Sequence, residues 1–571
     1  MKKKNNIKIK KNSLEVKKNL EKGLHYYNLE RYQESQLFLE KVLELDPVNF
    51  DAITMSSVIA YKTKNSALAA ELALIGLNIN PNSAKLHNHF SYVLRDLKLF
   101  DRAFKEIQIA IQLEPENPSH YKCRGSIYQD QEKFLEAKGD YERALKLKNN
   151  DELVFNNLGV VLAELKDYNK AIENYEKAIN LKSDYATAYS NLSLVYQKLH
   201  QYEKAKELIS KAISIDPKKD IFYTNQSAIL SDNNELEEAL KSLKISTELN
   251  PDNHDSFYNM GLTYLTLGHF FEGWKGYDHR WHVKSFNSKR IEFDKPILDV
   301  GQKAERLLIY GEQGIGDQIL YSSLLPLIEN IANRTIILVE KRLVELLNRS
   351  FPNIEFISEI NSKTIFDQYL ALGSLGKFFI NQADDFNKIA NKFLIANEAY
   401  SESLKNQLCL EKKLLCGISW RSKSGKHGES KSLTLEDFLP LFNLPNIQFV
   451  NLQYGNVEEE LKEFEHRHGI KILQCDSVDN MQDIDGLASL VEACDFVVTC
   501  SNTTTHIVGG LGKECYLMTP SNAGSLWYWG NVKDGRSLWY PSIQIFKQPS
   551  LNNWAGAMNL IVDKIKQKYL V

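Results

Sequence analysis

The 571-residue sequence has no long hydrophobic run and contains few cysteines. A membrane-spanning helix needs about 18 consecutive apolar residues, and this sequence offers none, so we expect no integral membrane segment. Six of the seven cysteines follow residue 400 and none belongs to a Cys-x-x-Cys pair, which argues against a disulfide framework and a zinc site. These absences predict a cytoplasmic protein without a bound metal.

The charge balance also lacks a strong excess of either sign. A net charge of -3 with 25% charged residues gives no reason to expect a nucleic-acid partner. Lysines crowd the first residues, from Lys2 to Lys11, without the apolar stretch of a secretory signal. We therefore expect a basic, disordered tail over residues 1–15, with binding of phosphate or a membrane surface as the alternative.

What the first half of the chain does have is a period of 34 residues. The period aligns five prolines: Pro47, Pro81, Pro115, Pro217 and Pro251. Glycine at the eighth position, an aromatic residue at the eleventh and alanine at the twentieth follow the same period. This pattern is the signature of tetratricopeptide repeats, pairs of antiparallel helices that bury their apolar faces by stacking. We expect an α superhelix of seven and a half repeats over residues 16–281, with softer helix ends where Asn149 and Ser183 replace the proline.

Asparagine recurs at the sixth position of the later repeats, on the expected inner surface of the superhelix. The row consists of Asn157, Asn191, Asn225 and Asn259. Asparagine amides can bond both groups of an extended peptide backbone, so the row predicts a groove for a protein partner. The alternative is that asparagine is simply common at this repeat position.

After a polar linker over residues 282–304, short apolar runs alternate with amphipathic segments, which indicates an α/β region. The first half of this region, residues 305–410, has expected strands at 307–310, 335–339 and 369–372. The second half, residues 411–571, has expected strands at 416–420, 447–452, 470–473, 496–500 and 515–518. Ligands of such folds bind where parallel strands end and where domains meet, so we expect the site in a cleft between the halves.

A glycine-rich segment, residues 311–317 (Gly-Glu-Gln-Gly-Ile-Gly-Asp), follows a strand and opens a helix. Glycines such as Gly314 and Gly316 let the backbone come close to a ligand at the helix start. The spacing matches neither the dinucleotide fingerprint nor the P-loop. Asp317 has two interpretations, a helix N-cap or a general base that takes a proton from an acceptor hydroxyl.

A second motif, Ser-Asn-Thr-Thr-Thr-His over residues 501–506, leads from a strand into a helix. Hydroxyls and unpaired amides at a helix start suit a diphosphate, which makes candidates of Asn502, Thr503, Thr504, Thr505 and His506. A basic loop after strand 416–420 could neutralise the leaving diphosphate, or it could be an ordinary solvated loop. Its cations are Arg421, Lys423, Lys426, His427 and Lys431.

Both motifs, with the segments 417–421, 451–455 and 539–542, resemble the repeat-linked branch of the heptosyltransferase-like glycosyltransferases over about residues 306–548. This resemblance implies a GT-B fold of two Rossmann-like halves, a nucleotide-diphosphate sugar as co-substrate, no cofactor or catalytic metal, and inversion at the anomeric carbon. It makes Asp317 the catalytic base, the turn from Thr503 to His506 the diphosphate site and Lys431 the phosphate lysine. It also implies that Asn502, Gln453 and Tyr454 lie near the nucleotide or the sugar.

The family's heptosyltransferases carry Asp-Thr where this chain has Ser501-Asn502, so transfer of heptose in particular is not implied. Repeats ahead of such a domain also resemble the protein O-GlcNAc transferases and their SPINDLY-like relatives. That resemblance implies an acceptor hydroxyl, on a protein or a glycan, recruited by the repeats. The competing hypothesis is a non-catalytic scaffold with a degenerate glycosyltransferase domain.

Three further features have structural interpretations. Asp483-Ile484-Asp485 imitates a metal-binding motif of another glycosyltransferase fold, but its place before a helix favours an N-cap. The aromatic residues at 527–529 and 539–540 are expected in the core, with a wall of the acceptor pocket as the alternative. Trp274, Tyr277 and Trp281 are expected to seal the last repeat against the α/β region.

Overall fold

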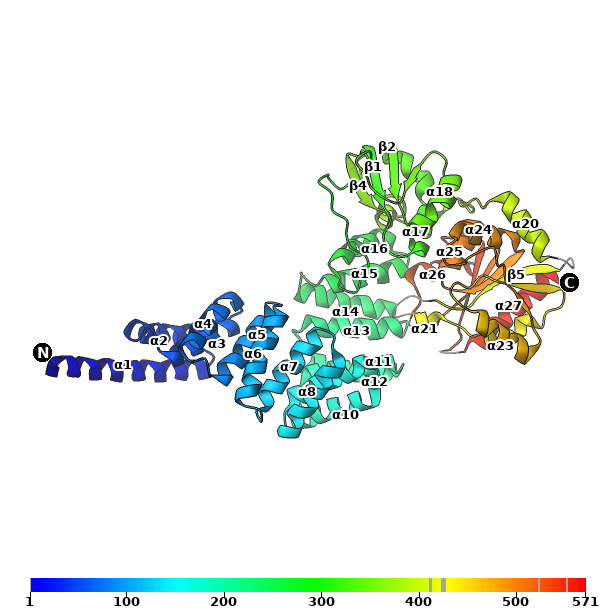
Figure 1. Cartoon of the computed structure of the whole chain (residues 1–571). Coiled ribbons are helices and arrows are strands. Elements are labelled where there is room, and N and C mark those ends of the chain that lie inside the picture. Colours follow the sequence, from blue (N-terminus) through cyan, green and yellow to red (C-terminus); the bar gives the residue numbers. More distant parts are fainter. Residues whose placement is uncertain (1, 410–412, 423–427, 522–523, 551–552, 571) are drawn as a thin grey trace. The chain divides into compact units, whose positions relative to one another are not determined.

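A computed structural model describes residues 2–409, 413–422, 428–521, 524–550 and 553–570, with side chains from Ser13 onward and not at Glu429 (Figure 1). The chain divides into two compact units, Met1–Pro217 and Lys218–Val571. This division falls inside the repeat region. The last two repeats therefore belong to the same unit as the α/β region.

The first unit is built from helical pairs. Residues 2–217, all of which the structure describes, form twelve helices: α1 (Lys2–Asn28), α2 (Tyr32–Leu45), α3 (Phe50–Lys62), α4 (Ser66–Ile79), α5 (Ala84–Asp96), α6 (Phe100–Leu113), α7 (Pro118–Asp130), α8 (Phe134–Leu147), α9 (Glu152–Glu164), α10 (Tyr168–Leu181), α11 (Ala186–Lys198) and α12 (Tyr202–Ile215). Of the tail expected over residues 1–15, residues 2–15 are instead part of α1. That segment contains neither proline nor glycine, so nothing in it ends the helix.

The turn inside each repeat uses a residue in the left-handed region. These residues lie 34 positions apart: Glu30, Lys64, Lys98, Glu132, Lys166, His200, Asn234 and Gly268. The softer helix ends expected at Asn149 and Ser183 are not seen, because α8 and α10 end two residues before them, as α2 ends two residues before Pro47. The second helix of these repeats therefore ends at the same position of the 34-residue period whether or not proline follows.

Glycine at the eighth repeat position permits the close helix packing that the sequence predicts. A Cβ atom added to Gly125 would lie 2.8 Å from the ring of Tyr141, and one added to Gly159 would lie 2.7 Å from Tyr175. Both tyrosines are buried. In these two repeats the tyrosine of the second helix thus packs directly against the first helix.

The second unit begins with the last two repeats, α13 (Asp220–Asp232), α14 (Leu236–Leu249), α15 (His254–Thr266) and α16 (Phe270–Tyr277), followed by the 3-10 helix η1 (Asp278–His282). Residues 2–282, described throughout, thus form eight helical pairs rather than seven and a half. The last pair has a second helix of only eight residues.

A four-stranded parallel sheet follows, with strand order β3-β2-β1-β4. Its strands are β1 (Ala304–Tyr310), β2 (Ala332–Leu338), β3 (Glu355–Ile357) and β4 (Gln368–Ala371). Its helical segments are α17 (Ile315–Ser322), η2 (Leu325–Asn330), η3 (Lys341–Leu343), α18 (Val344–Ser350), η4 (Leu372–Leu375), α19 (Gly376–Phe379), η5 (Ala383–Lys388) and α20 (Glu398–Leu408). The three strands expected here are present, and the short β3 was not predicted.

The second sheet has strand order β10-β11-β12-β9-β8-β5-β6-β7, and its pairs from β12 to β7 are parallel. The strands are β5 (Leu414–Ser419), β6 (Ile447–Asn451), β7 (Ile472–Leu473), β8 (Phe496–Cys500), β9 (Cys515–Thr519), β10 (Val532–Lys533), β11 (Arg536–Ser537) and β12 (Ile543–Lys547). The helices are α21 (Gly428–Lys431), η7 (Leu435–Phe438), α22 (Leu439–Phe442), α23 (Glu458–His468), α24 (Ile484–Ala493), α25 (Thr503–Gly510), α26 (Trp527–Gly530) and α27 (Trp554–Tyr569). The five expected strands are present, whereas β10–β12 and α27 were not predicted.

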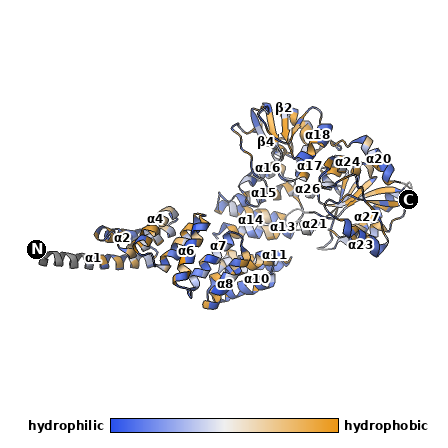
Figure 2. Cartoon of the chain, viewed as in Figure 1, coloured by the Kyte–Doolittle hydropathy of each residue, from blue (hydrophilic) through white to orange (hydrophobic). Residues whose placement is uncertain are grey.

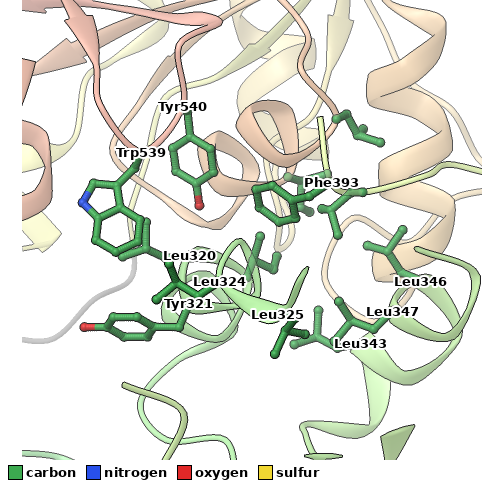
Figure 3. Close-up of a cluster of buried hydrophobic side chains, with 14 of the residues drawn as sticks. Leu320, Tyr321, Leu324, Leu325, Leu343, Leu346, Leu347, Phe393, Trp539 and Tyr540 are labelled. Atoms are coloured by element: carbon green, nitrogen blue, oxygen red, sulfur yellow. The ribbon is translucent and has the colours of Figure 1, made fainter. Parts of the chain in front are cut away.

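One apolar core runs through the last repeat and both sheets of the second unit. Figure 3 shows part of it, with Tyr321 of α17 near Trp539 and with Phe393 beside Tyr540. Central strands of both sheets, such as β1 and β8, supply hydrophobic side chains to this core (Figure 2). Because the elements share a core, α17 and α25 are held in fixed positions relative to each other.

Candidate active site at two facing helix starts

The segment of residues 311–317, here called the glycine loop, joins β1 to α17. Asp317 lies in the first turn of α17, and its Oδ2 atom accepts a hydrogen bond of 3.3 Å from the backbone N–H of Gly314. The N-cap of α17 is therefore Gly314 rather than Asp317, and Asp317 is the third residue of the helix, whose carboxylate completes a capping box. Burial raises the pKa of the Asp317 carboxyl to about 6, and the nearby charge of Glu312 adds to the effect. A carboxyl with such a pKa can exchange protons near neutral pH.

The segment of residues 501–506, here called the threonine turn, joins β8 to α25. The Asn502 side chain caps the helix by accepting from the N–H of Thr505 at 3.3 Å, and it donates to the Ser419 hydroxyl at 2.7 Å. The Thr505 and Thr504 hydroxyls donate to the carbonyls of Cys500 and Leu452. Only Thr503 of the three threonines is partly exposed. Backbone amides and the Thr503 hydroxyl are therefore the groups that this turn offers to a ligand, and the other two hydroxyls hold the turn together.

His506 brings the two helix starts together. A Cβ atom on Gly316 would lie 2.8 Å from the His506 ring, so only glycine allows this approach. The His506 Nδ1 atom lies 3.0 Å from the Tyr540 hydroxyl, and Tyr528 packs against the ring. Burial lowers the His506 pKa to about 3, so the ring is neutral near pH 7. Its role in this geometry is to position groups rather than to carry charge.

Lys431 is the buried cation of this site. Only 2% of its surface is exposed, and burial lowers its pKa, while the attraction of Asp317 opposes that change. Arg421, in contrast, is half-exposed and forms an ion pair of 2.6 Å with Glu460. The structure thus brings Lys431 to Asp317 and His506, and it directs Arg421 to α23. Lys423, Lys426 and His427 lie outside the described residues.

A pocket of about 440 Å³ opens at the ends of β6 and β7. Gln453 lines it, while the Gln453 side-chain oxygen accepts from the backbone N–H groups of Trp420 and Arg421 at 2.9 and 2.7 Å. Within the described residues the buried Oδ1 atom of Asn480, another lining residue, has no hydrogen-bond partner. Tyr454 is half-buried and does not line the pocket. A polar pocket of this size can hold a nucleoside.

The last repeat also reaches the site. Tyr258 of α15 lies near Asp317, and its pKa rises to about 12 because of burial and of charges that include this carboxylate. Trp274 donates from Nε1 to the carbonyl of Ile380 at 2.6 Å and packs edge-on against Trp527. Trp281 packs near Tyr310 of β1. The predicted seal between the last repeat and the α/β region is confirmed.

The remaining motifs have structural roles. The Asp483 carboxylate caps α24 by accepting from Gly486 N–H at 2.7 Å, and Asp485 pairs with Arg349. Four of the five clustered aromatic residues, Tyr528, Trp529, Trp539 and Tyr540, are buried in the core, and Trp527 is partly buried. In the described part of the chain, no group of three or more histidine, cysteine, aspartate or glutamate side chains is arranged to hold a metal ion.

The predicted asparagine row is divided between the units. Asn157 and Asn191 lie in the first unit, and Asn225 and Asn259 lie in the second. All four are partly exposed. Asn191 and Asn157 both bond to the buried side chain of Asn156, at 3.0 and 3.2 Å. Their amides are thus partly oriented before any partner arrives.

Comparisons with known proteins concern the repeats. Models of the tetratricopeptide repeat match residues 151–218, 19–49 and 124–151, and a TPR repeat model matches residues 229–268. The chain therefore carries tetratricopeptide repeats over these residues. Among described helices, none is long and apolar enough to cross a membrane.

Protein FlbA of Caulobacter vibrioides is 27% identical over 327 residues, which cover 53% of this chain and 53% of FlbA. The chain thus spans about half the length of this curated relative. Among solved structures, PilF of Pseudomonas aeruginosa is 20% identical with a TM-score of 0.33, and the match covers 36% of this chain and 94% of PilF. A tetratricopeptide repeat protein of Parabacteroides merdae is 14% identical with a TM-score of 0.38, and the match covers 44% of this chain and 99% of that one.

Proposed function

We propose that the chain is a metal-independent glycosyltransferase of GT-B type, which transfers a sugar from a nucleotide-diphosphate donor to an acceptor hydroxyl. The observation that carries this proposal is the meeting of the two helix starts, where Gly316 touches His506 and Lys431 lies near Asp317. One side offers a carboxylate with a raised pKa, and the other offers helix amides and a cation.

In the proposed reaction, Asp317 takes the proton of the acceptor hydroxyl as the acceptor oxygen attacks the anomeric carbon. The bond from that carbon to the diphosphate oxygen breaks at the same time, which inverts the anomeric centre. The N–H groups at the start of α25 and the Lys431 ammonium stabilise the charge that builds on the leaving diphosphate. The nucleoside binds in the pocket beside Gln453 and Asn480.

The acceptor in this proposal is a polypeptide or a glycan recruited by the repeats, in the cytoplasm. Asn259, the last residue of the asparagine row, lies on α15, the helix whose Tyr258 is near Asp317 within the second unit. A peptide bound along this surface would bring a hydroxyl towards the carboxylate.

The test is incubation of the full-length chain with a panel of nucleotide sugars, measuring release of the nucleoside diphosphate. Isothermal titration with uridine, guanosine, cytidine and adenosine diphosphates identifies the base. Release from at least one donor supports the proposal. Absence of both release and binding for every donor favours the competing hypothesis of a non-catalytic scaffold.

A further inference from the structure

We propose that Arg280 and Glu312 are positioning residues, the ion pair through which the last repeat holds the glycine loop and presents Asp317. This inference rests on the proposed function for its catalytic consequence. Its structural part, that the repeat fixes the loop, stands on contacts alone.

The pair is deeply buried and has good geometry. Arg280, on η1, is 0% exposed, and Glu312, in the glycine loop, is 4% exposed. Arg280 donates from Nη2 to Oε1 of Glu312 at 3.0 Å and from Nε to Oε2 at 3.2 Å. Two parallel bonds of this kind fix the orientation of both side chains.

Further hydrogen bonds and ring contacts hold the two charged side chains in place. Arg280 also donates to the Ser374 hydroxyl at 2.8 Å and lies over the rings of Tyr277 and Trp281 at 4.6 and 4.4 Å. Gly373 donates its backbone N–H to Glu312, and a Cβ atom at that position would collide with the carboxylate. The Glu312 carboxylate is thus held by the repeat on one side and by η4 on the other.

The loop that follows Glu312 is held by the same part of the chain. Gln313 has a φ of 62°, a left-handed conformation that residues other than glycine rarely adopt, so this backbone needs support from its neighbours. Its N–H donates to the Ser288 hydroxyl at 2.6 Å and its side chain donates to the Tyr277 hydroxyl at 2.7 Å. The next residue, Gly314, donates to Asp317. Contacts from residues 277–288 therefore determine where this carboxylate lies.

The ion pair is not explained by stability alone. Taking two charges out of water is costly, and a well-packed apolar pair often replaces a buried ion pair without loss of stability. If the ion pair mainly stabilises the fold, its replacement by apolar residues should destabilise the second unit. If the pair mainly positions the glycine loop, the same replacement should leave the fold intact and release the loop.

Two variants of the full-length chain separate these roles. Glu312→Gln removes the charge with almost no change of shape. Arg280→Met/Glu312→Leu removes both charged groups together. The matched control is Arg124→Met/Asp140→Leu, which removes a doubly bonded pair of the first unit with contacts of 2.7 and 2.7 Å.

For Arg280→Met/Glu312→Leu, we expect kcat for donor turnover to fall about 100-fold, as small displacements of a catalytic group can cause, with donor KM changed less than about threefold. Hydrogen exchange of residues 311–317 should accelerate in this variant. The control should match the wild type in both measurements.

Glu312→Gln gives a readout that a purely structural role would not move. The charges of Glu312 and Lys431 act on Asp317, the tyrosines Tyr258, Tyr321, Tyr528 and Tyr540 lie within reach of its charge, and His506 of α25 packs on the adjacent Gly316. Glu312 raises the pKa of Asp317, so its neutralisation should move the acid limb of kcat to lower pH. If Arg280→Met/Glu312→Leu does not fold, Glu312→Gln tests the inference by itself. Its two measurements are the acid limb of kcat and the hydrogen exchange of residues 311–317.

The inference would be overturned if these variants had the same turnover, the same hydrogen exchange of the glycine loop and the same acid limb of kcat as the wild type. If the wild type releases nucleotide from no donor, the proposed function fails and hydrogen exchange still tests the pair. A loop protected in the wild type and exposed in the double variant then supports the structural part, whereas equal protection contradicts it.

Discussion

The repeats of the first unit and the last repeat of the second share one period but differ in what their second helix contacts. At one position of the period, four repeats carry a buried alanine: Ala110, Ala144, Ala178 and Ala212. The corresponding residue of the last repeat is Arg280, which is buried against Glu312 of the glycine loop. In the first unit this position packs one helix on another, and in the last repeat it joins the solenoid to the candidate active site. The last repeat is therefore also part of the candidate active site.

Removal of all the repeats from the N-terminal side should affect donor turnover more than any single substitution at the seal. A chain that begins at Lys218 should keep donor turnover, because the second unit has its own core. A chain that begins after Trp281 should aggregate and lose turnover, because removal of Leu265, Trp274 and Tyr277 exposes that core. Nucleotide release and size-exclusion chromatography check both. An active chain without the last two repeats would break the comparison.

A single side chain at the seal should have the next largest effect. Trp274→Ala should lower the free energy of unfolding of the second unit by about 3–5 kcal/mol, because it leaves a cavity and removes the bond to Ile380. Lys138 occupies the same position of the period in the first unit, and Lys138→Ala should change stability by less than about 0.5 kcal/mol. Urea denaturation of each variant measures the difference. Similar values would mean that the last repeat packs no differently from the others.

Lys431→Gln should weaken binding of the nucleoside diphosphate. A hydrogen bond to a charged group contributes about 1.5–3 kcal/mol, so we expect the dissociation constant to rise about 10- to 100-fold. Arg421→Gln should have a smaller effect, because Arg421 is paired with Glu460 and half-exposed. Isothermal titration compares the two variants. A larger loss from Arg421→Gln would reverse the roles assigned here.

The smallest expected effect is the dependence of kcat on pH. A base must be deprotonated to act, so kcat should rise as pH increases through the Asp317 pKa of about 6 and then level off. Below that pH, each unit of pH should lower kcat about tenfold, as for a single titrating group. The chain that begins at Lys218 should show the same limb. A limb near the ordinary aspartate pKa of about 4 would contradict burial of this carboxylate.

Much of this architecture is predictable from the sequence because periodic patterns determine it. The 34-residue period gives the helices of the repeats, and apolar runs give the central strands of both sheets. The two short motifs are brought together as expected, through Gly316 and His506. Local patterns of this kind depend on neighbours in the chain, which a sequence shows directly.

The features that were missed depend on contacts between distant residues. Arg280 and Glu312 are 32 positions apart, and neither belongs to a motif that names its partner. The hydroxyls of Thr504 and Thr505 look available in the sequence, but the fold bonds them to backbone carbonyls. Short strands such as β3, β10 and β11 have only two or three residues, which is too few to carry a clear pattern.

The most direct test of the central claim is nucleotide release by the wild type and by Asp317→Asn, measured with whichever donor the panel identifies. Asp317→Asn should lower transfer by about 10²–10⁴-fold, the usual contribution of a general base. Donor affinity by isothermal titration should stay close to the wild-type value, because the proposed diphosphate contacts are on α25 and Lys431. Turnover at the wild-type rate in Asp317→Asn would rule out Asp317 as the base.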